Sequence, residues 1–107
     1  MNTMLNDIQK QRREAIYFAL AQIPTGKVIT YGNLAKLAGF PTGARLAGRL
    51  ICELPEDTEL PWHRVINAQG RSSLPPNSAS YNEQVQRLKD EGIEIVNGKI
   101  SLNRYRF

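Results

Sequence analysis

Apolar residues recur at helical spacing in the first part of the chain. Between Asn6 and Ile23 they fall mostly on one stripe of a helix, made of Ile8, Ala15, Ile16, Ala19 and Leu20. Asp7 in the first turn complements the positive end of the helix dipole, and the Pro-Thr-Gly run that follows Ile23 breaks the pattern. The sequence therefore predicts an amphipathic helix over residues 6–23.

Two shorter helices, separated by a turn, are predicted next. Thr30 can cap a helix over residues 31–38, which Gly39 would end. After a tight turn that contains Pro and Gly, a third helix is predicted over residues 42–53. Two short helices joined by such a turn indicate a helix-turn-helix, in which the small residues Ala35 and Gly39 would let the helices pack closely.

Strand and loop signals surround this helical pair. Residues 27–30 form a predicted short strand or extended entry to the second helix. Val65 and Ile66 are β-branched and suit a short buried strand. Residues 67–80 are rich in Gly, Ser, Pro and Asn, which predicts a surface loop.

A helix and a hairpin are predicted in the last third of the chain. Ser80 and Glu83 have the spacing of a capping box that would open a helix over residues 81–91. Asn97–Gly98 lies between two β-prone pairs and is a strong hairpin signal. A hairpin after a helix-turn-helix is the layout of a winged helix. We therefore expect a mainly α fold: one winged helix-turn-helix DNA-binding domain over residues 1–107, with a small β-hairpin wing.

Charge is unevenly distributed along the chain. The formal net charge is +4, but residues 15–52 contain no Asp or Glu at all. The basic residues of this segment are Lys27, Lys36, Arg45 and Arg49. Residues 60–82 also lack acids, which leaves Arg64 and Arg71 without a counterion nearby in the sequence. Such segments suit a polyanion-binding face, and ordinary surface scatter of charge is the alternative.

Several classes of protein are excluded by composition. No apolar run approaches the ~20 residues that cross a bilayer, and residues 1–10 lack the apolar region of a signal peptide. We therefore expect a cytoplasmic location. Cys52 is the only cysteine and His63 the only histidine, so we expect no disulfide, no structural zinc site, no metal and no cofactor.

The stretch Pro61–Val65, with the sequence Pro-Trp-His-Arg-Val, holds the only Trp and the only His. Its proline restricts the preceding residue to extended geometry, which places Trp62 on a stiff piece of backbone. Together with Thr30–Tyr31 and Arg45, this stretch resembles the DNA-binding domain of O6-alkylguanine-DNA alkyltransferases. Those enzymes carry the active-site motif Pro-Cys-His-Arg-Val, and the resemblance covers residues 15–92.

Trp62 stands where the enzymes carry their reactive cysteine. The replacement is similar to that of alkyltransferase-like proteins, which the resemblance implies bind O6-alkylguanine without removing the alkyl group. Alkyl transfer needs a nucleophile such as a thiolate, whereas an indole offers only a flat apolar wall for stacking. The alternative is that Trp62 is a core residue. Cys52, the rival nucleophile, has no His or Lys spaced to activate it, and is expected to be a small, buried and inert residue.

The third predicted helix carries most of the expected DNA contacts. By resemblance, Arg45 would enter the base stack and fill the hole left by a flipped nucleotide. A phosphate-contacting or solvated arginine is the alternative. Gly43, Ala44 and Gly48 leave parts of the helix bare, either for tight helix packing or for close approach to the minor groove, where this helix docks in the resembled family.

Residues from other elements complete the expected site. The resemblance implies that Tyr31 presses on the target phosphate and that Thr30, besides its capping role, contacts phosphate. His63 and Glu91 match a pair that activates cysteine in the catalytic relatives, and should persist as a structural hydrogen-bonded pair. Residues 71–76 would form a lid, and the carbonyls of residues 62 and 65 would meet the base edge. The expected lesion pocket consists of Tyr31, Trp62, Val65 and Pro75, the last of which replaces an Arg of some alkyltransferase-like proteins.

These observations together predict a monomeric, non-enzymatic protein that recognises DNA damage. It would bind double-stranded DNA containing O6-alkylguanine through the minor groove, flip the lesion, and plug the gap with Arg45. The resemblance alone implies that the complex flags the lesion for nucleotide excision repair proteins such as UvrA. Two alternatives remain open: an alkyltransferase with residual activity, and a sequence-specific winged-helix regulator.

Overall fold

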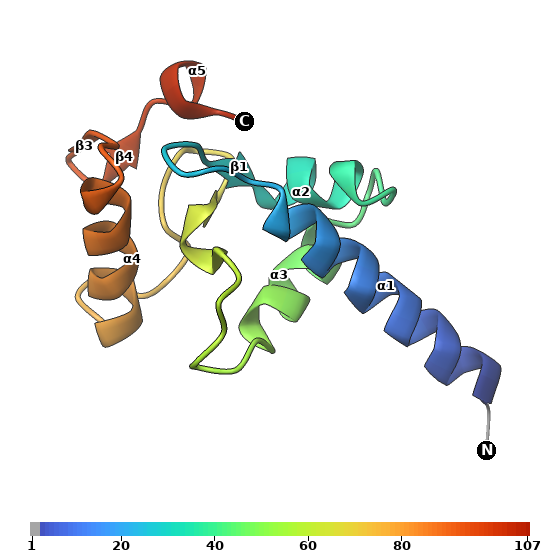
Figure 1. Cartoon of the computed structure of the whole chain (residues 1–107). Helices are drawn as coiled ribbons and strands as arrows, with labels where there is room; N and C mark the ends of the chain where they lie inside the picture. Colours follow the sequence, from blue (N-terminus) through green and yellow to red (C-terminus); the bar gives the residue numbers. More distant parts are fainter. Residues whose placement is uncertain (1–2) are drawn as a thin grey trace.

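The protein is described by a computed structural model over residues 3–107, and most of its ordered elements are helices (Figure 1). Its small strands form two separate pairs. In chain order the elements are α1 (Thr3–Ala21), β1 (Ile29–Thr30), α2 (Tyr31–Leu37), α3 (Ala44–Cys52), a 3-10 turn η1 (Trp62–Arg64), β2 (Val65–Ile66), α4 (Ala79–Asp90), β3 (Ile95–Val96), β4 (Lys99–Ile100) and α5 (Leu102–Tyr105). The predicted mainly helical fold with a small hairpin is thereby confirmed.

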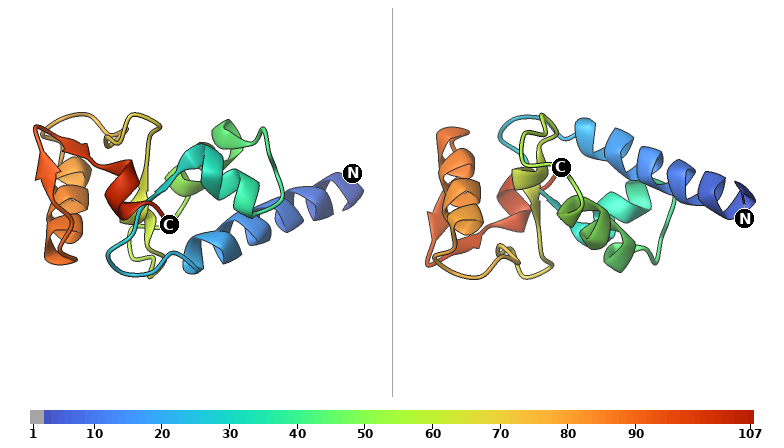
Figure 2. Two further views of the ribbon diagram at one scale, coloured as in Figure 1. Left: turned by 90° about the horizontal axis from the view of Figure 1, so that it is seen from above. Right: turned by 90° about the horizontal axis from the view of Figure 1, so that it is seen from below.

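Helix α1 begins three residues and ends two residues before the predicted bounds, and only its last turns reach the core. Ile16, Ala19 and Leu20 are buried, as their helical spacing predicts. Every residue from 3 to 14 is exposed, and the helix projects away from the rest of the molecule (Figures 1 and 2). Ile8 shares the predicted stripe but is exposed, because this part of the helix extends beyond the elements against which it packs.

The helix-turn-helix consists of α2 and α3. Thr30 caps α2 as predicted, since its Oγ1 accepts a hydrogen bond from Asn33 N at 3.2 Å. Gly39 follows α2 with a φ of +97°, a left-handed conformation that favours glycine. Its expected packing role was wrong, because a Cβ added at position 39 would meet no atom within 4 Å outside its immediate surroundings. Gly43 allows the close approach instead: a Cβ there would lie 2.8 Å from Phe40 Cβ.

A parallel pair of two-residue strands joins the two halves of the molecule. Strand β1 pairs with β2 in the register Ile29 to Val65 and Thr30 to Ile66, a pairing the sequence did not predict. Val65 and Ile29 belong to a hydrophobic cluster with α1, α2 and α3. Ile66 belongs to a second cluster with residues of α4, β4 and α5. Each strand face therefore covers a different core, because successive side chains alternate across a strand.

The C-terminal half contains α4, the hairpin and α5. Helix α4 is capped by Ser78, whose Oγ accepts from Tyr81 N at 3.2 Å, so the predicted capping box at Ser80 was wrong. The hairpin was predicted correctly: Asn97 and Gly98 have φ values of +53° and +75° and join β3 to β4. Helix α5 was not predicted. It returns the chain to the helical half, where a backbone bridge forms between residues 28 and 106.

Candidate nucleic-acid interface

Trp62 opens the 3-10 turn η1, and its indole is half-buried. The turn is held at its start by a hydrogen bond from Trp62 N to Leu60 O at 2.8 Å. The indole belongs to neither hydrophobic cluster, so the interpretation of Trp62 as a core residue is wrong. Its edge meets the His63 ring with centroids 6.2 Å apart, and the Arg87 guanidinium lies 5.6 Å from its centroid. A flat apolar surface is thus held on a fixed turn and remains partly open to solvent.

The residues that follow Trp62 are held by a single carboxylate, that of Glu91, the residue directly after α4. Glu91 Oε2 lies 2.6 Å from His63 Nε2 and 2.8 Å from Arg64 Nη2, and Gly26 N donates to Oε1 at 2.9 Å. The structure therefore brings His63 and Glu91 together. No acidic residue lies near Arg64 in the sequence, which indicated a cation without a counterion. In the structure Arg64 forms an ion pair with Glu91, 27 positions away.

Electrostatics define the charge state of this network. Burial by itself would raise the pKa of the Glu91 carboxyl, but hydrogen bonds from Arg64, Gly26 N and His63 outweigh burial and lower that pKa to about 2. Burial, together with the positive charges of Arg64 and Arg87, lowers the pKa of His63 below its usual value, although the Glu91 carboxylate raises it. At neutral pH, His63 is therefore neutral and donates its Nε2 proton to Glu91. The positive charge in the network is that of Arg64.

Tyr31 connects the helix-turn-helix with the loop expected to form the lid. Its hydroxyl lies 2.7 Å from Ser73 Oγ, and its ring is 3.8 Å from the place a Cβ would take at Gly48. Burial raises the pKa of the Tyr31 hydroxyl, so the group stays neutral and can donate a hydrogen bond. Pro75 is exposed further along the same loop, and Val65 offers the site only its backbone, since its side chain is 1% exposed in the core.

Arg45 lies in the first turn of α3 and is exposed next to exposed Ala44. Within residues 3–107 its guanidinium has no hydrogen-bond or ion-pair partner, whereas Arg49 lies 3.8 Å from Glu53 on the same helix. A free guanidinium beside a small side chain can reach into a groove without first breaking a contact. Packing against Phe40 accounts for Gly43, whereas a Cβ at Gly48 would make only ordinary contact with the Tyr31 ring, at 3.8 Å, so packing does not require glycine at position 48.

Cys52 occupies the last position of α3 and is exposed. The expectation that it would be a buried residue was wrong. Helix α3 ends at Cys52 without entering the core, because the buried residues of this helix are Ala47 and Leu50.

Gln84 was missed by sequence reasoning, although it is among the most buried polar residues of the described chain, at 2% exposed. Its amide contacts the carbonyls of His63 and Val65 and the hydroxyl of Ser72. The sequence gives no warning of this role, because a glutamine in an amphipathic helix is usually a surface residue.

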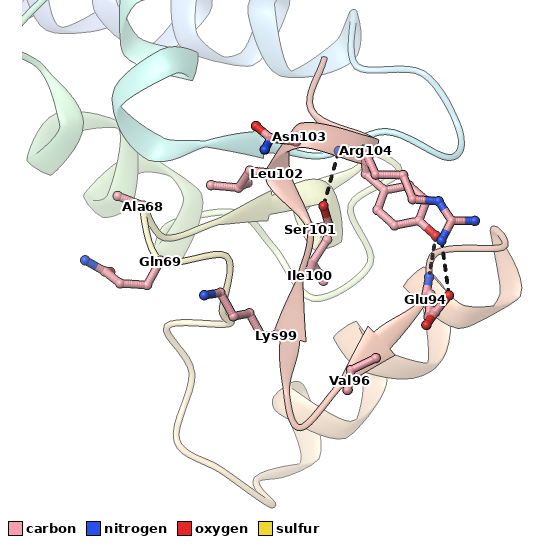
Figure 3. Close-up of a pocket in the computed structure, with 11 residues that line it drawn as sticks. Ala68, Gln69, Glu94, Val96, Lys99, Ile100, Ser101, Leu102, Asn103 and Arg104 are labelled. Carbon is pink, nitrogen blue, oxygen red and sulfur yellow. Dashed lines mark hydrogen bonds and ion pairs between the residues drawn. The ribbon is translucent and has the colours of Figure 1, made fainter.

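A hollow of about 630 Å³ lies away from all these residues (Figure 3). It is bounded by the hairpin, α5 and residues 68–69, at the end of the molecule opposite α1 (Figures 1 and 2). Arg104 Nη1 and Glu94 Oε2 form an ion pair of 3.1 Å at its edge. No residue of the expected lesion pocket lines this hollow.

The chain is similar to known proteins in both sequence and structure. The family described as 6-O-methylguanine DNA methyltransferase, DNA binding domain, matches residues 11–93. A Vibrio parahaemolyticus protein named DNA base-flipping protein is 47% identical over 93 residues, which cover 86% of this chain and 91% of that protein. Alkyltransferase-like protein 1 of Schizosaccharomyces pombe is 43% identical over 91 residues, covering 85% of this chain and 82% of that protein. The crystal structure of S. pombe Atl1 in complex with damaged DNA containing O6-carboxymethylguanine matches with a TM-score of 0.84 at 38% identity, over 92% of this chain and 95% of that one.

Proposed function

Because the chain belongs to the alkyltransferase-like family, whose DNA-binding domain is that of 6-O-methylguanine DNA methyltransferases, we propose that it recognises O6-alkylguanine in duplex DNA by flipping the nucleotide, without transferring the alkyl group. Relatives named DNA base-flipping protein and an Atl1 complex with O6-carboxymethylguanine support this proposal. Flipping costs a few kcal/mol and costs least for a weakly paired, damaged base, which favours the lesion before any pocket contact is made.

Trp62 is the observation that carries the proposal. The turn holds Trp62 half-buried, next to a His63–Glu91 pair 2.6 Å apart that lacks a thiol to activate. An indole offers no nucleophile for the alkyl carbon but can stack on a base or an alkyl group. The site thus keeps the means to bind a flipped base while it lacks the group that would accept the alkyl carbon.

Arg45 is the residue we assign to the gap in the base stack. Its guanidinium is unpaired among the described residues and leaves α3 in its first turn, where it can stack between bases and hydrogen-bond the orphaned partner. Thr30 and Tyr31 stand at the start of α2 and would contact the target phosphate. The resulting long-lived complex would mark the lesion for nucleotide excision repair.

The test is a titration, at fixed salt, of matched duplexes with and without one O6-methylguanine. We expect tighter binding to the damaged duplex, loss of that preference in Arg45→Ala, and its retention in the control Arg49→Ala on the same helix. Equal affinity of the wild type for both duplexes would refute the proposal. Strong preference among undamaged sequences would point instead to a sequence-specific regulator.

Alkyl transfer is tested separately by the mass of the intact protein after incubation with the alkylated duplex. We expect no adduct. A stoichiometric mass increase that disappears in Cys52→Ser would show that the exposed cysteine acts as an acceptor and that the protein is an enzyme.

A further inference from the structure

Gln84 uses its whole side-chain amide to hold other parts of the chain. Its Nε2 donates to His63 O at 3.2 Å and to Val65 O at 3.0 Å, and its Oε1 accepts from Ser72 Oγ at 2.5 Å. A primary amide has two N–H donors, so both are used. Gln84 is 2% exposed and its contacts with the two carbonyls are buried, so water does not readily replace the amide there and its removal would leave these carbonyls without that partner.

The three partners belong to the two sides of the proposed lesion site. The carbonyls of His63 and Val65 flank Arg64 in the backbone directly after Trp62, so their position fixes the turn that presents the indole. Ser72 lies in the loop that precedes α4, and its Oγ also accepts from Leu74 N at 3.1 Å. One buried side chain therefore joins the indole-bearing turn to the start of the loop.

Ser73, the next residue of the loop, is held by Tyr31 of the helix-turn-helix. Ser73 Oγ lies 2.7 Å from the Tyr31 hydroxyl, in an exposed contact, whereas the contact of Ser72 with Gln84 is partly buried. A DNA phosphate or a flipped base can compete for the exposed contact at Tyr31. The partly buried contact of Ser72 with Gln84 is less accessible to such competition.

We propose that Gln84 is a positioning residue that sets the spacing between the Trp62 turn and the lid loop, and thereby the preference for damaged over undamaged guanine. The claim about the preference for damaged guanine rests on the proposed function. The claim about the spacing between the Trp62 turn and the lid loop concerns the free protein alone and is tested without DNA.

Three variants separate this role from a general effect on folding. Gln84→Leu keeps the approximate size of the side chain and removes all three bonds. Ser72→Ala removes the link between Gln84 and the loop, together with the hydrogen bond that Ser72 Oγ accepts from Leu74 N. Gln86→Leu is the matched control, since Gln86 is exposed on the same helix and its amide contacts only Asp90, at 2.8 Å. All are compared at a temperature where circular dichroism shows each to be folded.

Two readouts are measured. Trp62 is the only tryptophan, so acrylamide quenching of fluorescence reports the exposure of its indole in the free protein. We expect stronger quenching in Gln84→Leu. In the titration above, we expect the preference for O6-methylguanine to fall about tenfold in Gln84→Leu and Ser72→Ala, which corresponds to the net contribution of about one hydrogen bond, with affinity for undamaged duplex unchanged. Gln86→Leu should match the wild type in both.

Unchanged quenching in folded Gln84→Leu, or unchanged preference in Ser72→Ala, would overturn the proposal. If Gln84→Leu does not fold, the preference of Ser72→Ala decides. If the wild type itself shows no preference for the lesion, the proposed function fails, and the quenching of Gln84→Leu still decides whether Gln84 fixes the turn.

Discussion

Replacing Glu91 by Gln removes the negative charge on which the site's network depends, at almost constant size. The carboxylate accepts from Arg64, His63 and Gly26 N, and its side chain is only 12% exposed. In Glu91→Gln the Arg64 side chain, itself 15% exposed, keeps its charge but loses its counterion. A buried charge without a partner is strongly destabilising.

The magnitude follows from the pKa of the carboxyl. Lowering the pKa of Glu91 from 4.5 to about 2 corresponds to about 3 kcal/mol of stabilisation of the folded state at neutral pH. Breaking a buried ion pair by removing one partner costs about 3–5 kcal/mol, which agrees with this figure. We therefore expect Glu91→Gln to lower the free energy of unfolding by about 3 kcal/mol, a large part of the stability of a small domain.

The assay is urea unfolding at pH 7, followed by circular dichroism. With a slope of about 1.5 kcal/mol per molar urea, the midpoint should fall by about 2 M. Glu14→Gln is the control, because its pair with Lys10 is exposed on both sides and should contribute less than about 0.5 kcal/mol. A midpoint of Glu91→Gln equal to that of Glu14→Gln would refute the reasoning.

The pH dependence gives a second check. Since the pKa of Glu91 is lower in the folded state, its stabilisation is fully present above pH 4.5 and is lost as the pH falls towards about 2. The pKa of His63 is also lowered, from 6.5, so its protonation begins to destabilise the folded state below pH 6.5. In Glu91→Gln the loss of stability between pH 4.5 and 2 should be smaller than in the wild type, and an unchanged acid limb would contradict the assignment.

Three further substitutions test the packing around the site. Gly70→Ala should lower the free energy of unfolding by more than about 2 kcal/mol, because the φ of Gly70 is +81° and a Cβ would lie 2.5 Å from Ile100 O. A urea midpoint within about 0.3 M of the wild type, on the order of the error in such scans, would argue against this prediction. Tyr17→Phe loses the 2.8 Å bond to Leu50 O and should cost about 1 kcal/mol in thermal unfolding, and an unchanged Tm would show that the bond contributes nothing. Thr30→Ala should cost about 1 kcal/mol by removing the cap of α2, with Thr30→Ser restoring most of it; failure of the serine variant to recover stability would mean that capping is not the cause.

Local signals in the sequence predicted the local structure well. The cap at Thr30, the end of α2 at Gly39 and the turn at Asn97–Gly98 each depend on the backbone preferences of a few adjacent residues. The start of α4 was displaced by two residues because Ser78 and Ser80 offer the same capping group. The extended backbone at Ser78, which follows Asn77 with a φ of +67°, decided between them.

Features that depend on distant contacts were not predictable. The partner of Arg64 is 27 positions away, and the pairing of β1 with β2 joins residues 36 positions apart, so neither produces a pattern within a short window. Helical periodicity at Ile8 is genuine, but whether a helix stripe is covered depends on what lies opposite. Within the candidate site, Trp62 and Arg45 were identified from a motif, whereas Gln84 follows only from the folded backbone that it contacts.

The two-residue strand β2 gives Val65 and Ile66 quite separate surroundings. Val65 is enclosed by the helical half and Ile66 by the C-terminal half, although the two residues are adjacent in sequence. Loosening one half alone leaves the strand held by the other, so the backbone between them is released only when both compartments open. The turn that carries the indole directly precedes this strand, so it is held in place by the packing of both halves and not of one alone.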